Sequence, residues 1–434
     1  MRNCRLPARR AAADLTPLAS SYLVAHFGKS LMWHGGNVAF AFYLTEICGQ
    51  SPATMAWLLA LSSIVNAVAD GVIGAGLARR IKDGAAASRQ QFAGSVAAGS
   101  AFAAFCAAGL VPEALRLGYA LCTLFAFRIA YATVDVPQNA LLTYIPADSR
   151  AQERLVASRM MAGYAAQVTT ALLISSLLLQ ASSSNAARFA LGGAAVGMAA
   201  ILTALALRLR WGDRSGIRAA VMRSAGDVRA APGFFRLLLA CAAFAFSSTL
   251  VIRLQAYIAA FAPEAGSSPD GGTMTVFVPV AMAVGGLAGQ PFWAALCSRH
   301  GVRATLRIAS IALIGTALAF GASASSNSLW IAIATGLFGA ALGGTSFALW
   351  ALLARGARDG STAMRFGMFT CTSKLAHALS AAALGAMLSG GDYRAAAGAG
   401  PDLWSLSMIA AIGMGAILLV LDIRLPPFRR RSSA

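Results

Sequence analysis

Charged side chains inside apolar runs are the residues of this sequence with the clearest chemical potential. Asp135 and Arg159 lie on either side of a short turn, in the stretch YATVDVPQNALLTYIPADSRAQERLVASR that runs from Tyr131 to Arg159. A carboxylate in hydrocarbon costs about 2.5 kcal/mol or more to insert, so it marks a candidate functional site. A carboxylate accepts hydrogen bonds from hydroxyls and a guanidinium donates them in a planar fork. We expect an Asp135–Arg159 ion pair that binds a polyhydroxylated or zwitterionic solute. The alternative is a pair that only locks two helices together.

Two neighbours of Asp135 on the same predicted helix extend this candidate site. Tyr131 lies one turn before Asp135 and is expected to stack against a solute. Arg128 lies two turns before Asp135 on the same helix face. It is expected either to neutralise Asp135 or to face an external vestibule. Arg253, in another apolar run, is expected to snorkel toward the outer membrane surface.

Lysines in two further runs predict a second group of charges. Lys29 and Lys374 stand in two apolar runs and are candidate solute-binding residues, and one acid, Asp70, is expected to be reachable from both. A charge network between them is expected, and its simplest form is neutralisation of Asp70. The histidines and cysteines show no ligand spacing, so no metal site and no cofactor are expected. His26, His34 and His377 are expected to pack between helices. Cavity-wall candidates among the aromatics are Trp33, Tyr164, Trp293 and Trp350, with packing or a lipid-facing position as the alternative.

Composition defines the class of protein. The chain has 434 residues, of which 58% are hydrophobic and 12% charged, and the apolar residues come in runs of about 20. That balance predicts an all-α integral membrane protein whose environment is a lipid bilayer. The net charge of +19 lies almost entirely in loops, so nucleic acid is not an expected partner. The twelve predicted spans are 20–44, 53–77, 91–111, 118–145, 155–180, 189–209, 235–260, 274–297, 307–324, 329–354, 366–389 and 403–423.

Loop charge predicts the orientation. Lys and Arg number 26 on the side of the termini and 3 on the other side, Arg116, Arg188 and Arg394. The positive-inside rule then places both termini in the cytoplasm of a bacterial cell, with the spans in its inner membrane. The expected organisation is a tail at 1–19, a six-helix half at 20–209, a cytoplasmic central loop at 210–234, a second half at 235–423 and a basic tail at 424–434. Two six-helix halves with a midplane site are the layout of the major facilitator fold.

Several segments resemble the glycoside–pentoside–hexuronide:cation symporters, the melibiose-permease-like branch of the major facilitator superfamily. The segments are SYLVAHFGKSLMW and FAFYLTEICGQS in span 1, IVNAVADGVIG in span 2, VDVPQNALLTYIPADSRAQERLVASR across spans 4 and 5, and FTCTSKLAHALSAAALG in span 11. The resemblance implies sugar and coupling cation bound between the halves. It places substrate at Asp135 and Arg159, the cation at the positions of Asn66 and Asp70, and Lys374 between the two sites.

Departures from the family pattern change what it implies for coupling. Ser30 replaces an acid that helps hold sugar hydroxyls, Asn139 replaces a stacking tryptophan, and Asn66 replaces one of two cation-binding aspartates. One remaining acid, Asp70, is a poor sodium site, whereas a carboxylate alternately paired with lysine and released is a workable proton carrier. The coupling ion is therefore expected to be a proton, with sodium as the alternative.

These observations favour a secondary active transporter for a small, sugar-like solute, and not an enzyme. The alternative is an exporter of a drug or secondary metabolite, because the intramembrane arginines suit an anionic solute. A membrane sensor that no longer transports is a third hypothesis, which the weakened cation motif suggests.

Overall fold

The computed structural model describes residues 6–78, 81, 83–145, 149–179, 185–212, 232–261, 277–326, 328–356, 362–394 and 402–424. Helices account for nearly all of them, because runs of apolar residues about 20 long satisfy their backbone hydrogen bonds internally as helices. The first half consists of α1 (Leu6–Phe42), the π-helical turn η1 (Tyr43–Ile47), α2 (Pro52–Ala78), α3 (Gly84–Cys106), α4 (Glu113–Tyr144), α5 (Ser149–Leu179) and α6 (Asn185–Trp211).

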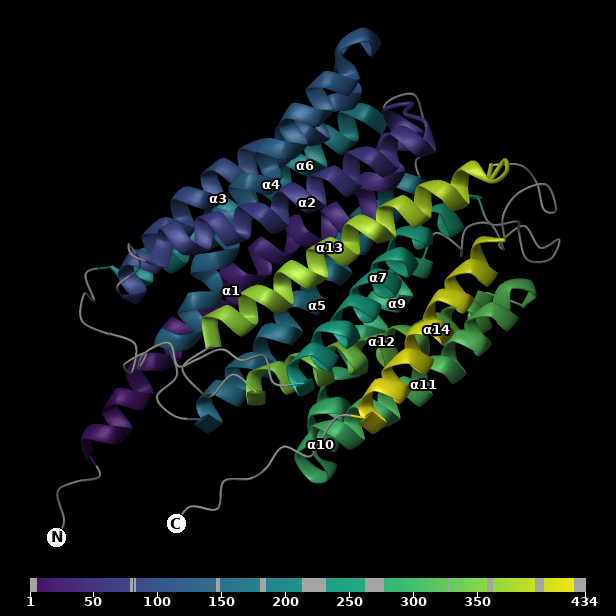
Figure 1. Cartoon of the computed structure of the whole chain (residues 1–434). Coiled ribbons are helices and arrows are strands. Elements are labelled where there is room, and N and C mark those ends of the chain that lie inside the picture. Colours follow the sequence, from purple (N-terminus) through teal and green to yellow (C-terminus); the bar gives the residue numbers. More distant parts are fainter. Residues whose placement is uncertain are drawn as a thin grey trace.

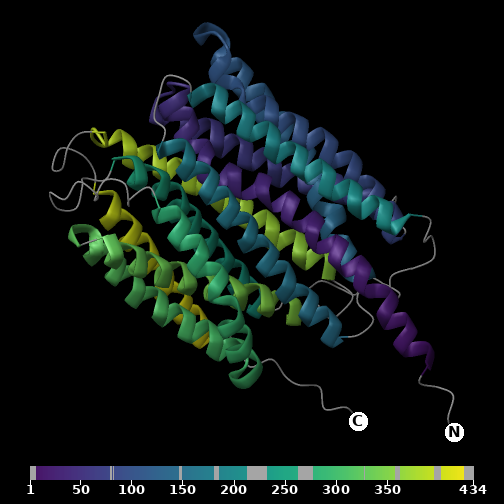
Figure 2. The same cartoon turned by 180° about the vertical axis from the view of Figure 1, so that it is seen from behind.

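The second half repeats this pattern of long helices. It consists of α7 (Pro232–Phe261), α9 (Val278–Ala288), α10 (Gln290–His300), α11 (Val302–Ala322), α12 (Ser328–Gly356), α13 (Thr362–Ser389) and α14 (Leu403–Arg424). Within the first half, α3 packs against α4 and α6. Within the second half, α12 packs against α9 and α11. Figures 1 and 2 show the two halves side by side, with the beginning of α1 and the end of α14 at the same end of the bundle.

Nine segments of the described chain are long and apolar enough to cross a membrane. The long helices outside that set are α1, α5 and α13. These three carry Lys29, Arg159 and Lys374, charged residues of the candidate site that contribute to their lower hydropathy. Lipid-facing positions are also evident, since α2 exposes a stripe at helical spacing composed of Trp57, Leu61, Ile64, Val68 and Val72.

The two halves meet mainly along two helix pairs, α2 with α13 and α5 with α9. Glycine permits the approach at both. A Cβ atom on Gly385 of α13 would lie 2.3 Å from the Cβ of Ala56 on α2, and one on Gly286 of α9 would lie 2.7 Å from the ring of Tyr164 on α5. At the far end, Gly49 has φ +68, a left-handed conformation that suits glycine where the chain turns from η1 into α2.

Among the described residues, twelve long helical segments match the predicted spans, with two differences in their limits. α1 begins at Leu6, so most of the predicted tail at 1–19 continues the first helix. The predicted span 274–297 is two helices, α9 and α10, which meet at Gly289 immediately before Pro291. Much of the predicted central loop 210–234 and all of the basic tail beyond Arg424 lie outside the described residues.

Candidate functional site

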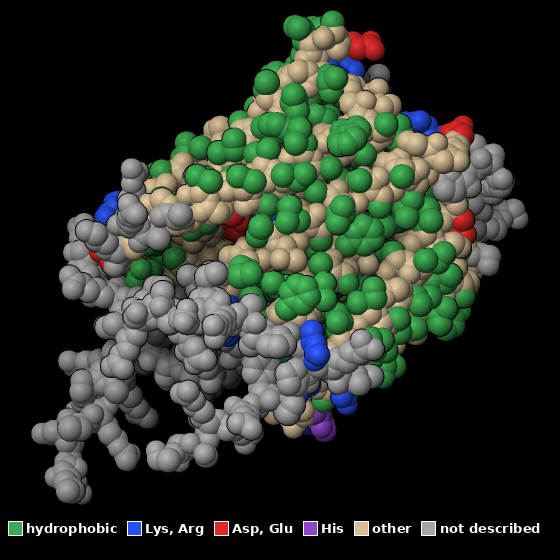
Figure 3. All heavy atoms as spheres, in the orientation of Figure 1, with side chains coloured by type: hydrophobic (Ala, Val, Ile, Leu, Met, Phe, Trp, Pro, Cys, Tyr) green, Lys and Arg blue, Asp and Glu red, His purple; other side chains and the backbone are tan. Residues whose placement is uncertain are grey.

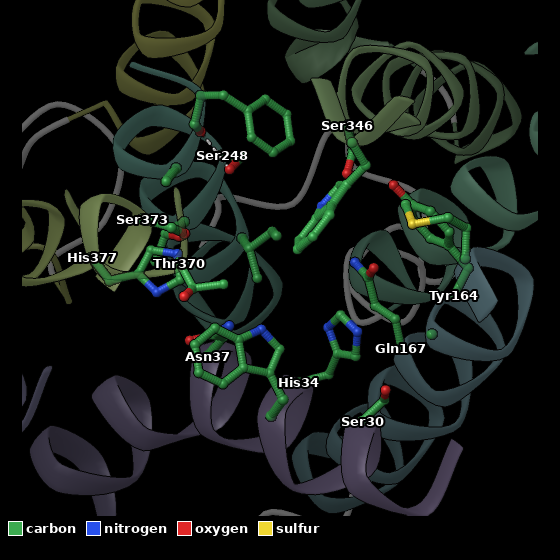
Figure 4. Close-up of a pocket in the computed structure, with 18 of the residues that line it drawn as sticks. Ser30, His34, Asn37, Tyr164, Gln167, Ser248, Ser346, Thr370, Ser373 and His377 are labelled. Carbon is green, nitrogen blue, oxygen red and sulfur yellow. Dashed lines mark hydrogen bonds between the residues drawn. The ribbon is translucent and has the colours of Figure 1, made fainter. Parts of the chain in front are cut away.

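A cavity of about 280 Å³ lies between the two halves. Its lining comes from α1, α4 and α5 of the first half and from α7, α9, α12 and α13 of the second. Figure 4 shows polar side chains directed into it from several of these helices, among them Ser30, Asn37, Gln167, Ser346 and Ser373. Figure 3 shows acidic atoms in a recess toward the end where α1 begins. The cavity can therefore surround a small polar solute with hydrogen-bonding groups from both halves.

Asp135 forms its close ion pair with Lys29 and not with Arg159. The distance from Lys29 Nζ to Asp135 Oδ1 is 2.5 Å, and both side chains are nearly buried, with exposed fractions of 6% and 13%. Pro137 lies two residues beyond Asp135 and removes one backbone hydrogen bond from that part of α4. The predicted Asp135–Arg159 ion pair is wrong. The acid joins α4 to α1 instead of α5.

Lys374 links the second acid to the first. Its ammonium group donates to the Asp70 carboxylate and, at 3.0 Å, to Asn66 Oδ1. The same nitrogen lies 4.0 Å from Asp135 Oδ2. One lysine of the second half thus contacts the two acids of the first half, from α2 and α4. The predicted network of Asp70 and Lys374 is present, whereas Lys29 belongs to Asp135.

Arg159 lies in the cavity wall with an amide and an indole as neighbours. Its Nη2 donates to Asn139 Oδ1 at 2.6 Å, and its guanidinium carbon lies 5.6 Å from the centre of the Trp350 ring. Asn139, where the family resemblance implied a stacking tryptophan, thus holds the arginine by an amide hydrogen bond, and Trp350 supplies an aromatic face. Arg159 remains available to the cavity, which it lines together with Asp135 and Asn139.

Aromatic and histidine side chains occupy more of the cavity wall than the sequence suggested. Tyr131 lines the cavity as predicted, and its ring stacks on Trp33 at 5.6 Å. The Trp33 ring lies 5.4 Å from that of His377. His26 and His34 also line the cavity, as do Tyr164 and Trp350. The position of these three histidines at the cavity was not predicted, and their expected role in helix packing stays a prediction. The available signal was their occurrence in spans 1 and 11, the spans that carry Lys29 and Lys374.

Two further arginines are buried beyond the cavity lining. Arg128 lies over the rings of Phe127 and Phe40, at 5.5 and 6.0 Å, and does not contact Asp135. Arg253 is 1% exposed, and its Nη1 donates to the carbonyl of His377 at 3.3 Å. The expected snorkelling of Arg253 is wrong, because the side chain is enclosed within the protein and bonds to α13 of its own half. The neutralisation of Asp135 by Arg128 is also wrong, since Lys29 takes that role.

Comparison with known families gives a match along almost the whole chain. Residues 21–425 match the family model described as MFS/sugar transport protein. The chain belongs to the MFS/sugar transport protein family. It is therefore a multi-pass membrane transporter of the major facilitator type, as the sequence motifs indicated. The melibiose-permease-like branch within that family stays a prediction.

Solved structures similar to this transporter share its fold at low identity. A peptide transporter POT in complex with alafosfalin has a TM-score of 0.62 and 12% identity, and the match covers 94% of each chain. A bacterial homologue of the iron transporter ferroportin in an inward-facing state has a TM-score of 0.62 and 14% identity, with coverage of 95% of this chain and 99% of that one. Comparison with curated protein sequences finds no significant relative.

The transporter's cavity is closed at the end opposite the beginning of α1. There Thr45 Oγ1 and Tyr257 Oη share a hydrogen bond of 3.0 Å across the two halves. Arg394 donates to both oxygens of Glu46, at 2.9 and 3.0 Å, and Tyr393 donates to Glu46 at 2.7 Å. The hydrogen bonds to Glu46 raise the pKa of Arg394 above its ordinary value, so the guanidinium stays charged. We refer to these residues as the η1 gate, after the element that contributes Thr45 and Glu46.

Proposed function

We propose that this protein is a secondary active transporter that moves a small, polar, sugar-like solute across the membrane by alternating access. The proton is its coupling ion and Asp70 its carrier. The observation that supports this most directly is the position of Lys374. It is bonded to Asp70 and Asn66 on one side and lies 4.0 Å from Asp135, a cavity residue, on the other. An ion bound or released at Asp70 is thereby coupled to the solute site.

The cavity supports the solute class. A volume of about 280 Å³ suits a molecule of monosaccharide size, since drug-sized ligands occupy pockets of about 300–1,000 Å³. Asp135 and Arg159 supply an acceptor and a planar donor at one side of the cavity, and Tyr131 and Trp33 supply stacked rings nearby. Carboxylate, guanidinium and aromatic face are the groups that bind polyhydroxylated rings.

The contacts of Lys374 favour a proton over sodium. A sodium ion needs several oxygen ligands, and here the Asp70 carboxylate and the Asn66 carbonyl oxygen both accept from the Lys374 ammonium. The position between them is thus filled by a positive charge of the protein itself. A proton needs a single oxygen, and the buried Oδ1 of Asp70 has no hydrogen-bond partner within the described chain.

Protonation of Asp70 has a defined consequence for its neighbours. The proton neutralises the carboxylate, and the ion pair with Lys374 is lost. A buried ammonium without a counter-charge is strongly unfavourable, so Lys374 turns to Asp135, which is already within 4.0 Å. Lys374 then competes with Lys29 for this acid. Protonation of Asp70 therefore changes the contacts between the two halves. It also changes how Asp135 is presented to the solute.

The orientation predicted from loop charge gives this cycle a direction in space. The η1 gate closes the predicted external side, so the described state is open toward the cytoplasm.

Export is the second candidate function. It is favoured by Arg159, a cation in the cavity wall whose described neighbours are the Asn139 amide and the Trp350 ring. Such a cation suits the anionic solute of a secondary-metabolite or drug exporter.

The test begins with a thermal-shift screen of the purified protein against sugars, sugar alcohols, sugar acids and amino acids. Radiolabelled forms of the stabilising solutes are then followed in proteoliposomes under an imposed pH gradient or an imposed sodium gradient. We expect accumulation with the pH gradient and none with sodium alone. Accumulation that requires sodium and ignores pH would refute the proposed coupling. An absence of movement of every stabilising solute would refute transport.

A further inference from the structure

Two buried arginines near the η1 gate have no acidic partner in the described part of the chain. Arg128 on α4 is 3% exposed and Arg253 on α7 is 1% exposed. The ion pairs among described residues involve Lys29, Lys374 and Arg394. The Nε atoms of both arginines also lack a hydrogen-bond partner there. Two guanidinium groups with a permanent charge and unused N–H donors are thus held inside the protein.

The contacts of these arginines fix their positions without neutralising them. Arg128 lies over the Phe127 and Phe40 rings, which hold its planar group by cation–π attraction. Arg253 donates to a single backbone carbonyl, that of His377. Aromatic faces and one carbonyl compensate a buried cation only in part. Both side chains are therefore preorganised but short of negative charge.

The two arginines come from opposite halves and lie next to residues that line the cavity. Arg253 donates to the backbone carbonyl of His377, and the His377 ring lies 5.4 Å from that of Trp33, which in turn stacks on Tyr131 at 5.6 Å. Tyr131, one turn after Arg128, and Ile252, next to Arg253, line the cavity as well. Buried cations without a counter-charge are unfavourable, and an anion near both arginines would compensate them. An anion there would also connect α4 to α7 across the interface.

The charge balance of the interior leads to the same expectation. Around the cavity the described helices place two acids, Asp70 and Asp135. The cations there are more numerous, namely Lys29, Arg128, Arg159, Arg253 and Lys374. The two acids are both occupied by lysines. Three arginines therefore remain for a negative charge that the described chain does not supply.

The geometry points to an oxyanion-binding site between Arg128 and Arg253, at the gate end of the solute cavity, which takes a carboxylate or phosphate group. This inference rests on the proposed function in one respect, because it names the chemical class of the solute that the same cavity accepts. The group is either part of the transported solute or a free anion that binds beside it. In both cases it draws α4 and α7 together and stabilises the state in which the η1 gate is closed.

The test uses the purified full chain in a buffer of low anion content, with sodium phosphate and sodium acetate as probes. Thermal unfolding midpoints are recorded against probe concentration and converted to an apparent Kd. We expect at least one probe to stabilise the wild type. Arg128→Gln and Arg253→Gln should each weaken its binding by about tenfold or more, the effect of losing one charged hydrogen-bonding partner. Arg210→Gln, which changes an exposed arginine of α6, is the matched control and should bind as the wild type does.

Lysine variants keep the test decisive if a glutamine variant does not fold. Arg128→Lys and Arg253→Lys retain the charge but lose the planar fork, and we expect a Kd raised by about threefold or more. A wild type that neither probe stabilises would overturn the inference. Equal Kd values in the wild type and in the Arg128 and Arg253 variants would also overturn it. Binding is measured without transport, so a failure of proton-coupled uptake leaves this result intact, and the reverse also holds.

A matched pair of solutes identifies the source of the anion. Glucuronate and glucose differ by one carboxylate, and each is titrated with and without saturating phosphate. Competition between glucuronate and phosphate, with weaker binding of glucose, assigns the site to a group on the solute. Binding of glucose that phosphate leaves unchanged or strengthens assigns it to a free anion. Both outcomes uphold the oxyanion site, and the Arg253→Gln variant should abolish the phosphate effect in either case.

Discussion

Replacing Asp135 by Asn tests the reassigned ion pair most sharply. The substitution leaves Lys29, with a 6% exposed side chain, without its counter-ion at 2.5 Å. Removing one member of a buried pair costs about 3–5 kcal/mol, because the remaining charge stays desolvated. Lys374 does not relieve this cost, since it is a second cation. Removing Lys29 as well eliminates the stranded charge, so Lys29→Gln combined with Asp135→Asn should be less destabilised than Asp135→Asn alone.

The assay is a double-mutant cycle on protein purified in detergent. For a chain of this length, a loss of 3–5 kcal/mol lowers the unfolding midpoint by about 3–5 °C. We expect that shift for Asp135→Asn and recovery of at least half of it in the double variant. The control cycle pairs Asp135→Asn with Arg159→Gln, where we expect near-additive changes because Arg159 bonds to Asn139. A larger coupling in the Arg159 cycle than in the Lys29 cycle would refute the reasoning.

Three further predictions concern the gate, the interface and the topology. Glu46→Gln removes the bidentate contact of Arg394. Because that arginine is 46% exposed, we expect a shift of only about two- to fivefold toward the opened gate, which should be absent at high salt. Maleimide labelling of a cysteine introduced at the cavity residue Ser30 measures the shift against the same cysteine variant with Glu46 intact. Gly385→Ala places a methyl group 2.3 Å from a side-chain carbon of α2 and should lower the free energy of unfolding by about 1–3 kcal/mol. Gly413→Ala, with open space around its Cβ, is the control and should not destabilise the protein. Equal effects on thermal unfolding would contradict the packing argument. Reporter fusions at Ser184 and at the C-terminus should report opposite sides of the membrane, and the same side for both would contradict twelve spans.

The sequence was sufficient for the spans because hydropathy and loop charge are local properties. Nine apolar segments are found where runs of about 20 residues predicted them. The other three long helices, α1, α5 and α13, were also predicted. Their hydropathy is lower, and Lys29, Arg159 and Lys374 contribute to this. The break between α9 and α10 at Pro291 was visible in the sequence as a proline, but its effect on a long apolar run was not.

The partners of the charged residues could not be predicted in the same way. Asp135 and Arg159 are separated by one short turn, which suggested that their helices pair. In the fold, α4 packs mainly on α3 and α2, and α5 on α1 and α9. Asp135 instead meets Lys29, which is 106 residues away, and no local pattern encodes that contact. The pairing of Lys374 with Asp70 was expected because the family resemblance supplied long-range information that spacing lacks.

The burial of Arg253 shows a second limit of sequence reading. Arginine near the end of an apolar run usually reaches the interface with its long side chain. Here α7 is enclosed between α13, α14 and α1, and the side chain lies beneath the Tyr257 contact of the η1 gate. Whether a charged residue faces lipid or the other half depends on the rotation of its helix. Helix rotation follows from packing and not from composition.

The central claim is that Asp70, paired with Lys374, carries the coupling proton. Its most direct test compares wild type and Asp70→Asn in proteoliposomes, with the stabilising solute from the thermal-shift screen as probe. Solute exchange without a gradient and accumulation driven by a pH gradient are measured on the same preparation. We predict that Asp70→Asn retains exchange, since the asparagine needs no proton, and loses accumulation by about tenfold or more. Full pH-driven accumulation by Asp70→Asn, or accumulation that sodium stimulates in the wild type, would contradict the claim.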